Sequence, residues 1–267
     1  MQITDVFGFL SSILIGVSLG LIGGGGSILT LPVLVYLLHI NPVLSTSYTL
    51  FVVGITSLIG SLNYMRRSLV DYRAAVIFAV PSFLTVWLTR HYLLPLVPDV
   101  LFEISGFSVS KDLTIMLLFA LVMLLASVSM LRRRKAIAEE SMQVSFNYSL
   151  IGLYGVAIGI LTGIVGAGGG FLIIPALVLF AHLPMKMAVG TSLLIIAANS
   201  LIGFASSVAS VSINWSFLFE FTTLSVLGIF IGSYMSRFIA GEKLKRTFGW
   251  FVLAMGVYIL SKELIFR

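Results

Sequence analysis

The chain alternates long apolar stretches with short polar ones, a pattern that predicts helices crossing a membrane. Ten segments are mostly apolar: 5–22, 27–39, 45–64, 73–96, 112–131, 148–165, 170–182, 186–208, 215–238 and 246–265. Most contain about the 20 residues that span a bilayer core. The two segments that follow glycine clusters, 27–39 and 170–182, have only 13 residues each. We expect an all-α polytopic membrane protein, because the strict alternation typical of membrane β-barrel strands is missing.

Composition supports a membrane class and excludes several others. Apolar residues make up 59% of the chain, charged residues only 10%, and the mean hydropathy is +1.12, whereas soluble domains carry about 25% charged residues. The net charge of +6 is typical of basic loops on the cytoplasmic side of a membrane, so we expect a lipid bilayer and no nucleic acid as partner. The chain has no cysteine, which excludes disulfides and thiolate metal sites. The first apolar segment lacks a basic flank and a cleavage site, so we interpret it as a retained helix.

The two glycine clusters mark an internal duplication. The sequence GGGGSILTLP, residues 23–32, corresponds to GAGGGFLIIP, residues 166–175, at an offset of 143 residues. At this offset the chain matches itself without a gap from about residue 15 to about residue 90. We therefore expect two homologous repeats, 1–131 and 148–267, joined by a basic cytoplasmic connector, 132–147.

The distribution of basic residues distinguishes two topologies. If each glycine cluster is a kink within one span, there are eight helices in a four-plus-four arrangement, with nine basic residues on one side and seven on the other. If each cluster is a turn, there are five segments per repeat, the repeats are inverted, and the basic residues divide twelve to four. The positive-inside rule favours the inverted five-plus-five arrangement, with short broken or re-entrant segments after the turns and both termini outside.

A break in a helix at membrane depth exposes backbone groups that hydrocarbon cannot satisfy, and transporters use such breaks to line substrate cavities. The free N–H groups and the positive dipole ends of the two short segments would form an anion site. The candidate substrate-binding residues are Gly24, Gly25, Gly26, Ser27, Gly168, Gly169 and Gly170. The alternative is that small residues only allow helices to pack closely, which is our interpretation of Gly16, Gly20, Gly159 and Gly163.

Polar side chains within the following segments extend the candidate site. Thr49, Thr191, Ser192 and Asn199 lie on segments 45–64 and 186–208. Buried hydroxyls also bond the carbonyl of the preceding helical turn, which is the alternative reading for each. Asn199 is the strongest candidate because a side-chain amide at mid-span requires a partner.

Few ionisable residues lie inside the apolar segments. Glu220 is the acid most clearly within one, which suggests proton coupling. His39 and His182 are repeat partners at the ends of the short segments, where they either cap helix C-termini or take part in proton coupling. Inversion would place these histidines on opposite sides of the membrane, so we expect no shared metal site and no cofactor. Arg90 lies near the outer end of its segment, where it either snorkels to the interface or attracts anions to a mouth.

These motifs resemble the TauE/SafE family of sulfite-exporter-like membrane proteins. The second half is similar in GIVGAGGGFLIIPALV, AVGTSLLIIAANSLIG and INW, and the first half in GLIGGGGSILTLPVLV and LVDY. The first half departs from the family at SYTL, where Tyr48 and Thr49 stand at the positions that correspond to Thr191 and Ser192. The resemblance implies transport of small sulfur-containing anions such as sulfite, thiosulfate or organosulfonates.

The function that we expect is a secondary transporter of such an anion in the cytoplasmic membrane, driven by an ion gradient or by the gradient of the anion itself. A passive anion channel is the nearer alternative, and a membrane-embedded enzyme is a more distant one. We expect no enzymatic activity, because Glu220 and two separated histidines do not form a catalytic cluster. A homo-oligomer is compatible with this function.

The inverted arrangement predicts the sidedness of two loops that correspond in the repeats. In the cysteine-free chain, Ser68→Cys should react with an impermeant maleimide from the cytoplasm, and Val211→Cys from outside. Labelling of both positions from the same side would exclude inversion.

Overall fold

The computed structural model describes residues 3–98, 100–104, 107–131, 148–166, 169–181, 183–208, 211–239 and 241–265. The first half contains α1 (Ile3–Ile22), α2 (Gly25–Pro32), the π-helix η1 (Val33–Leu37), α3 (Pro42–Met65), α4 (Tyr72–Leu88), the π-helix η2 (Thr89–Leu93), α5 (Leu94–Leu96) and α6 (Lys111–Leu131). The second half contains α7 (Tyr148–Val165), α8 (Gly170–Phe180), α9 (Met185–Ser207), α10 (Trp215–Met235) and α11 (Gly241–Ile265). A short antiparallel hairpin, β1 (Val100–Ile104) with β2 (Phe107–Ser110), precedes α6.

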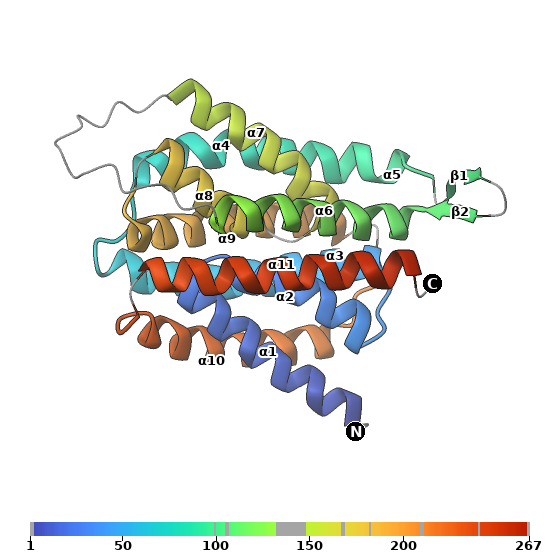
Figure 1. Cartoon of the computed structure of the whole chain (residues 1–267), viewed down its shortest axis with the longest axis horizontal. Coiled ribbons are helices and arrows are strands. Elements are labelled where there is room, and N and C mark those ends of the chain that lie inside the picture. Colours follow the sequence, from blue (N-terminus) through green and yellow to red (C-terminus); the bar gives the residue numbers. More distant parts are fainter. Residues whose placement is uncertain are drawn as a thin grey trace.

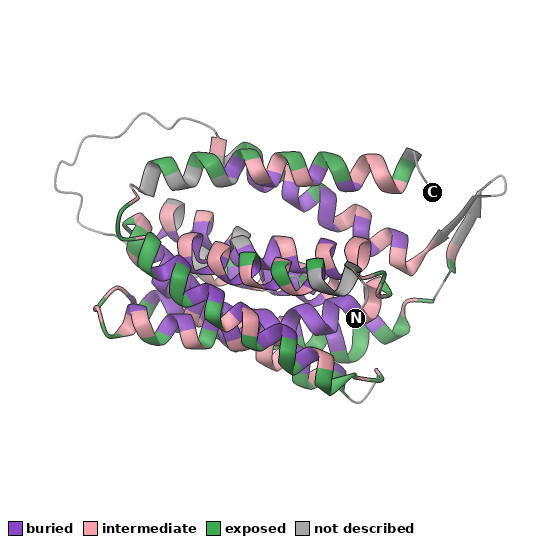
Figure 2. Ribbon diagram, turned by 90° about the horizontal axis from the view of Figure 1, so that it is seen from below, coloured by how far each residue is buried: buried purple, intermediate pink, exposed green. Residues whose placement is uncertain are grey.

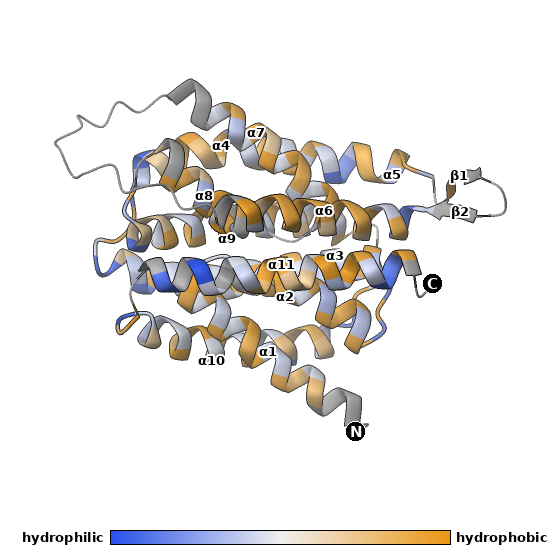
Figure 3. Ribbon diagram, viewed as in Figure 1, coloured by the Kyte–Doolittle hydropathy of each residue, from blue (hydrophilic) through white to orange (hydrophobic). Residues whose placement is uncertain are grey.

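The helices form a bundle whose long axes run broadly along one direction, with the start of α1 and the end of α11 toward the same end (Figure 1). Five helical stretches in the described residues are long and apolar enough to cross a bilayer: Pro42–Met65, Tyr72–Leu96, Lys111–Val128, Met185–Ser207 and Trp215–Met235. Hydrophilic residues gather mainly toward the ends of the bundle (Figure 3). The expectation of an all-α polytopic membrane protein is confirmed, with the small hairpin as its one addition in the described part.

Local capping explains where the long helices begin. The Asn41 side chain accepts the N–H of Val43 at 2.9 Å where α3 starts. Asp71 accepts the N–H of Ala74 before α4, and Asn214, the repeat counterpart of Asp71, does the same for Phe217 before α10. Such N-caps satisfy backbone donors that the first helical turn leaves free.

The chain reverses direction at each glycine cluster. Gly26 packs back against the backbone of Ile15, although a continuous helix would hold these residues about 16 Å apart. In the second repeat, Gly169 packs in the same way against Ile158 and Thr162. Gly23, Gly166 and Gly169 have φ values of +77°, +70° and +65°, a left-handed conformation that glycine adopts at little cost. Each cluster is therefore a turn between two helices that pack on each other, as the five-plus-five arrangement predicts; the choice between the two arrangements in the membrane stays a prediction.

Corresponding contacts recur with the repeats exchanged. Helix α1 packs on α10, and its counterpart α7 packs on α4, the counterpart of α10. Gly16 meets the backbone of Ser225, and Gly159 meets the backbone of Ser82. Gly159 lies 143 positions after Gly16, and Ser225 lies 143 positions after Ser82. The second contact is therefore the first one with the repeats exchanged, so the two halves are related by an approximate two-fold operation.

The helices α3 and α9 contact each other across this two-fold relation. A Cβ on Gly60 would lie 3.5 Å from Leu193, and a Cβ on Gly203 would lie 3.2 Å from Leu50, the exchanged pair. These contacts run antiparallel, as an inverted five-plus-five arrangement requires. The arrangement in the membrane and the repeat boundaries 1–131 and 148–267 remain predictions, and the connector 132–147 lies outside the described residues.

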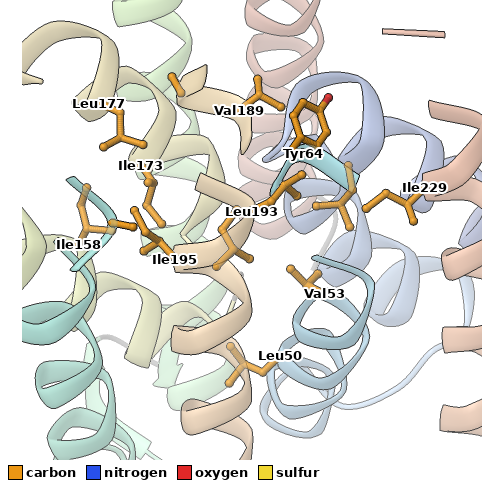
Figure 4. Close-up of a cluster of buried hydrophobic side chains, with 14 of the residues drawn as sticks. Leu50, Val53, Tyr64, Ile158, Ile173, Leu177, Val189, Leu193, Ile195 and Ile229 are labelled. Atoms are coloured by element: carbon orange, nitrogen blue, oxygen red, sulfur yellow. The ribbon is translucent and has the colours of Figure 1, made fainter. Parts of the chain in front are cut away.

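The interior is apolar and is shared by both repeats. Buried residues concentrate where helices face one another, while the outer faces of peripheral helices are exposed (Figure 2). Leu50 and Val53 of α3 belong to the same buried cluster as Leu193 and Ile195 of α9 (Figure 4). Ile229 of α10 joins it (Figure 4), so neither repeat has a core that is closed without the other.

Two glycines on α7 provide a matched test of the close packing between α4 and α7. A Cβ on Gly159 would collide with the Ser82 backbone and Thr85, whereas a Cβ on Gly152 would meet nothing within 4 Å. Gly159→Ala should destabilise the fold by about 1–3 kcal/mol, typical of overpacking, and Gly152→Ala should not. Thermal unfolding in detergent measures both variants; equal melting temperatures would contradict this account of the interface.

Candidate functional site

The N-terminal ends of the two short helices meet inside the protein. Gly24 is the N-cap of α2, and Gly170 is the first residue of α8. Both are buried, and a Cβ on Gly170 would lie 2.9 Å from the Cα of Gly24 and 2.5 Å from Ile196 of α9. Because neither helix has a side-chain cap or an acidic residue in its first turn, the free amides and positive dipole ends converge without compensation by a carboxylate there.

Each glycine turn is lined by the third helix of the other repeat. Val189 and Ser192 of α9 lie against Gly23, and the Ser192 hydroxyl contacts the Gly23 carbonyl at 3.4 Å while it donates to Val189 O at 2.8 Å. Thr46 of α3, the counterpart of Val189, lies against Gly166. Ser192 of the second repeat therefore lies at the turn of the first repeat.

Thr191 has a structural partner on the other repeat. Its hydroxyl accepts the backbone N–H of Asp71 at 2.9 Å, at the start of α4. Tyr48, its counterpart in the first repeat, accepts the N–H of Asn214 at 2.8 Å, at the start of α10. The departure at SYTL therefore preserves this contact, since the longer tyrosine carries its hydroxyl to the corresponding backbone donor.

Several buried polar atoms on the central helices have no hydrogen-bond partner. Thr56 and Ser57 of α3 correspond to Asn199 and Ser200 of α9, and all four residues are fully buried. The unpartnered atoms of the described residues are Thr49 Oγ1, Thr56 Oγ1, Ser57 Oγ, Arg90 Nη2, Thr162 Oγ1, Asn199 Oδ1, Ser200 Oγ and Ser233 Oγ. Natural proteins rarely leave such atoms unsatisfied, so each is a candidate contact for a polar ligand.

Asn199 illustrates both interpretations of a buried polar side chain. Its Nδ2 donates to Ser82 Oγ of α4 at 2.6 Å, which confirms the expected need for a partner. Its Oδ1 has none, as is also true of the Thr49 hydroxyl, so a role in binding stays a prediction for both. Ser27 is buried at the first turn, and its hydroxyl donates to Gly24 O at 2.7 Å.

Glu220 and His39 lie away from the two turns. Glu220 is exposed on α10, where it lines a surface groove of about 540 Å³ with Phe9 and Phe219. His39 is exposed just after η1, with a φ of +54°, which fits a helix C-terminal cap. The roles of Glu220 and His39 in proton coupling remain predictions. Gly168 and His182 lie outside the described residues, and the described part contains no cluster of three acids or histidines able to hold a metal.

Arg90 lies in the interior of the protein and not at the membrane interface. It is only 3% exposed, so the interpretation as a snorkelling side chain is wrong. Its Nε donates to Gly163 O at 2.8 Å, and its Nη1 donates to Ser47 Oγ at 3.2 Å. The available signal was its repeat counterpart Ser233, because a polar residue at both equivalent positions indicates an inward-facing site.

The architecture defines a multi-pass helical membrane protein with two broken helices that meet at their N-terminal ends. The chain belongs to the TauE/SafE family: the family model described as "Sulfite exporter TauE/SafE" matches residues 8–259. It is 29% identical over 258 residues to a "Probable membrane transporter protein" of Xylella fastidiosa strain Temecula1, covering 94% of this chain and 92% of that one. It is 28% identical over 244 residues to "Probable membrane transporter protein YunE" of Bacillus subtilis strain 168, covering 81% and 83% of the two chains. No solved structure matches the chain.

The family and these relatives together make the protein a membrane transporter. The geometry of the turns can therefore be interpreted as that of a transport site.

The bonds from Thr191 and Tyr48 to backbone amides predict a stability effect. Thr191→Val and Tyr48→Phe should each destabilise the fold by about 1–3 kcal/mol, because each leaves a backbone N–H without its acceptor. Thr223→Val is the control, since the exposed Thr223 hydroxyl bonds only within its own helix, to Phe219 O. Thermal unfolding measures all three variants. If Thr191→Val or Tyr48→Phe melts at the same temperature as the control, the corresponding contact adds no stability.

Proposed function

We propose that the protein is a secondary transporter that moves a small sulfur-containing anion, of the sulfite, thiosulfate or organosulfonate type, across the cytoplasmic membrane. The contact between Gly24 and Gly170, which brings two helix N-termini together in the buried interior, carries this proposal. Backbone amides at helix N-termini bind oxyanions without a compensating metal. The family description supports a sulfur anion as the substrate.

The anion would be held by the turns and by the neutral side chains around them. Backbone N–H groups at Gly26 and Gly170, with the unpartnered Thr49 hydroxyl, would supply donors to the oxygens of a sulfite or sulfonate group. The Ser192 hydroxyl would join them on giving up its bond to Val189 O. Neutral donors suit a transported ion, because a substrate must be bound and then released. The protein would act without chemical conversion of its substrate.

Binding of an anion between the helix ends requires the two short helices to separate. Gly24, Gly170 and Ile196 are in close contact, so this conformation leaves no room for an ion between the helix ends. Alternating access would come from movement of one broken helix, with its long neighbours, relative to the other. Because each turn is lined by the other repeat, such movement would dismantle the site on one side at a time.

The substrate proposal predicts ligand-dependent stabilisation of the purified protein. Sulfite, thiosulfate, methanesulfonate or sulfoacetate should raise the melting temperature at constant ionic strength, and chloride should not. Binding at one hundred times the dissociation constant stabilises a protein by about 2.7 kcal/mol. If none of the four sulfur anions stabilises the protein, the proposed substrate class is wrong. Flux into proteoliposomes then separates a carrier, with saturable exchange, from a channel with large potential-driven currents.

A substitution at the second turn tests whether the turn belongs to the site. Gly169→Leu should abolish stabilisation by sulfur anions, because Gly169 has a φ of +65° and its Cβ would collide with the Thr162 hydroxyl. Gly152→Leu on the same hairpin is the control, since its Cβ would meet open space. Stabilisation of Gly169→Leu equal to that of the control would remove this turn from the binding site.

A further inference from the structure

We infer that Arg90 supplies a fixed positive charge at the turn between α7 and α8, and that it binds the anionic group of the transported substrate there. This inference rests on the proposed transport of an anion between the two turns. It makes the two turns chemically different, one cationic and one neutral. The matching ligand is a small ion with one anionic head group, oriented so that this group faces the second turn.

The burial of Arg90 is the first observation. Of the side chains that the structure describes, it is the one charged group in the buried class. It stands in the π-helix η2, within the stretch Tyr72–Leu96 that can span a membrane. π-Helical turns are rare and frequently occur at functional sites.

The second observation is that the charge has no counter-ion. Arg90 donates to a backbone carbonyl, Gly163 O, and to a hydroxyl, Ser47 Oγ, both of which are neutral. Within the described ranges, no carboxylate lies within ion-pair distance of it. Guanidinium groups stay protonated in proteins, and a buried unpaired charge costs several kcal/mol. A bound anion would offset this cost.

The third observation is the direction of the free donor. Arg90 Nη2 has no hydrogen-bond partner, and a Cβ on Gly166 would lie 2.5 Å from it. Gly166 lies between α7 and the N-terminus of α8, where the N-cap Gly169 provides no side chain. The unpartnered N–H group of Arg90 and the free amides of α8 therefore flank the same turn, and together they provide charge-assisted donors for an oxyanion.

The first turn lacks this charge. The counterpart of Arg90 is Ser233, which is buried and neutral. The carbonyl of Gly20, the counterpart of Gly163, accepts instead from the Tyr64 hydroxyl at 3.1 Å. Both repeats therefore satisfy the carbonyl at the end of the long helix, but only the second does so with a group that retains a spare donor and a formal charge.

A purely structural role for Arg90 makes a different prediction. If the guanidinium only satisfies Gly163 O, its removal lowers stability and leaves ligand selectivity unchanged. If it binds the substrate, its removal specifically weakens the binding of charged ligands. Methanesulfonate and dimethyl sulfone separate these cases, because they are close in size and shape and differ by one negative charge.

The experiment measures apparent dissociation constants of both ligands from melting-temperature shifts at constant ionic strength. We expect wild-type protein to prefer methanesulfonate, and Arg90→Gln to lose about ten- to a hundredfold of that preference, the usual strength of charge-assisted hydrogen bonds. Arg90→Lys should keep the preference, with weaker binding because an ammonium group cannot reproduce the planar fork. Arg73→Gln, an exposed arginine in the first turn of α4, should match the wild type.

The possible results separate this inference from the proposed function. Binding of methanesulfonate by Arg90→Gln with wild-type preference would overturn the role of Arg90 and leave the substrate proposal standing. The wild type could instead prefer another anion, such as formate or phosphate. If Arg90→Gln loses that preference, the result would support the role of Arg90 and reject sulfur anions as the substrate. If Arg90→Gln does not fold, Arg90→Lys decides, because unchanged methanesulfonate affinity in that variant would overturn the inference.

Discussion

The structure depends on how backbone groups are satisfied where a helix breaks inside an apolar interior. Hydrocarbon offers no hydrogen bonds, so every carbonyl and amide freed by the glycine turns needs a partner from the protein or from a ligand. The carbonyl side is served by the protein: Tyr64 donates to Gly20 O and Arg90 donates to Gly163 O. The amide side has no side-chain cap at α2 or α8, whose N-terminal ends meet at Gly24 and Gly170. This division makes the amide ends the natural place for an anion.

The duplication explains why the site forms between the repeats. Each turn is lined by the third helix of the other half, as Ser192 does for the first turn and Thr46 for the second. Contacts between the repeats also hold the bundle together. The hydroxyls of Thr191 and Tyr48 accept hydrogen bonds from backbone N–H groups at the starts of α4 and α10, each in the other repeat. A site shared in this way changes whenever one repeat moves relative to the other, which is the physical requirement for alternating access.

Departures from the two-fold relation are as informative as the relation itself. Two hydroxyl-bearing turns of equal polarity would bind an anion symmetrically, in either orientation. Arg90, opposite the neutral Ser233, breaks this equality by one formal charge. The π-helices η1 and η2 lie in the first repeat, while the corresponding stretches of α8 and α10 are α-helical. The first repeat therefore carries the irregular backbone, and it supplies the charge to the turn of the second.

Hydropathy, length and glycine content act locally along the chain, so they were enough to predict the membrane class, ten helical segments, the duplication and the two breaks. The N-cap bonds of Asp71 and Asn214 are local in the same sense, because they reach only three residues ahead. Tertiary structure alone decided which side chains face the turns: it gave Thr191 a structural partner, moved Glu220 to the surface and buried Arg90. The physical reason is that position along a helix fixes depth, whereas direction around its axis depends on neighbours contributed by the other repeat.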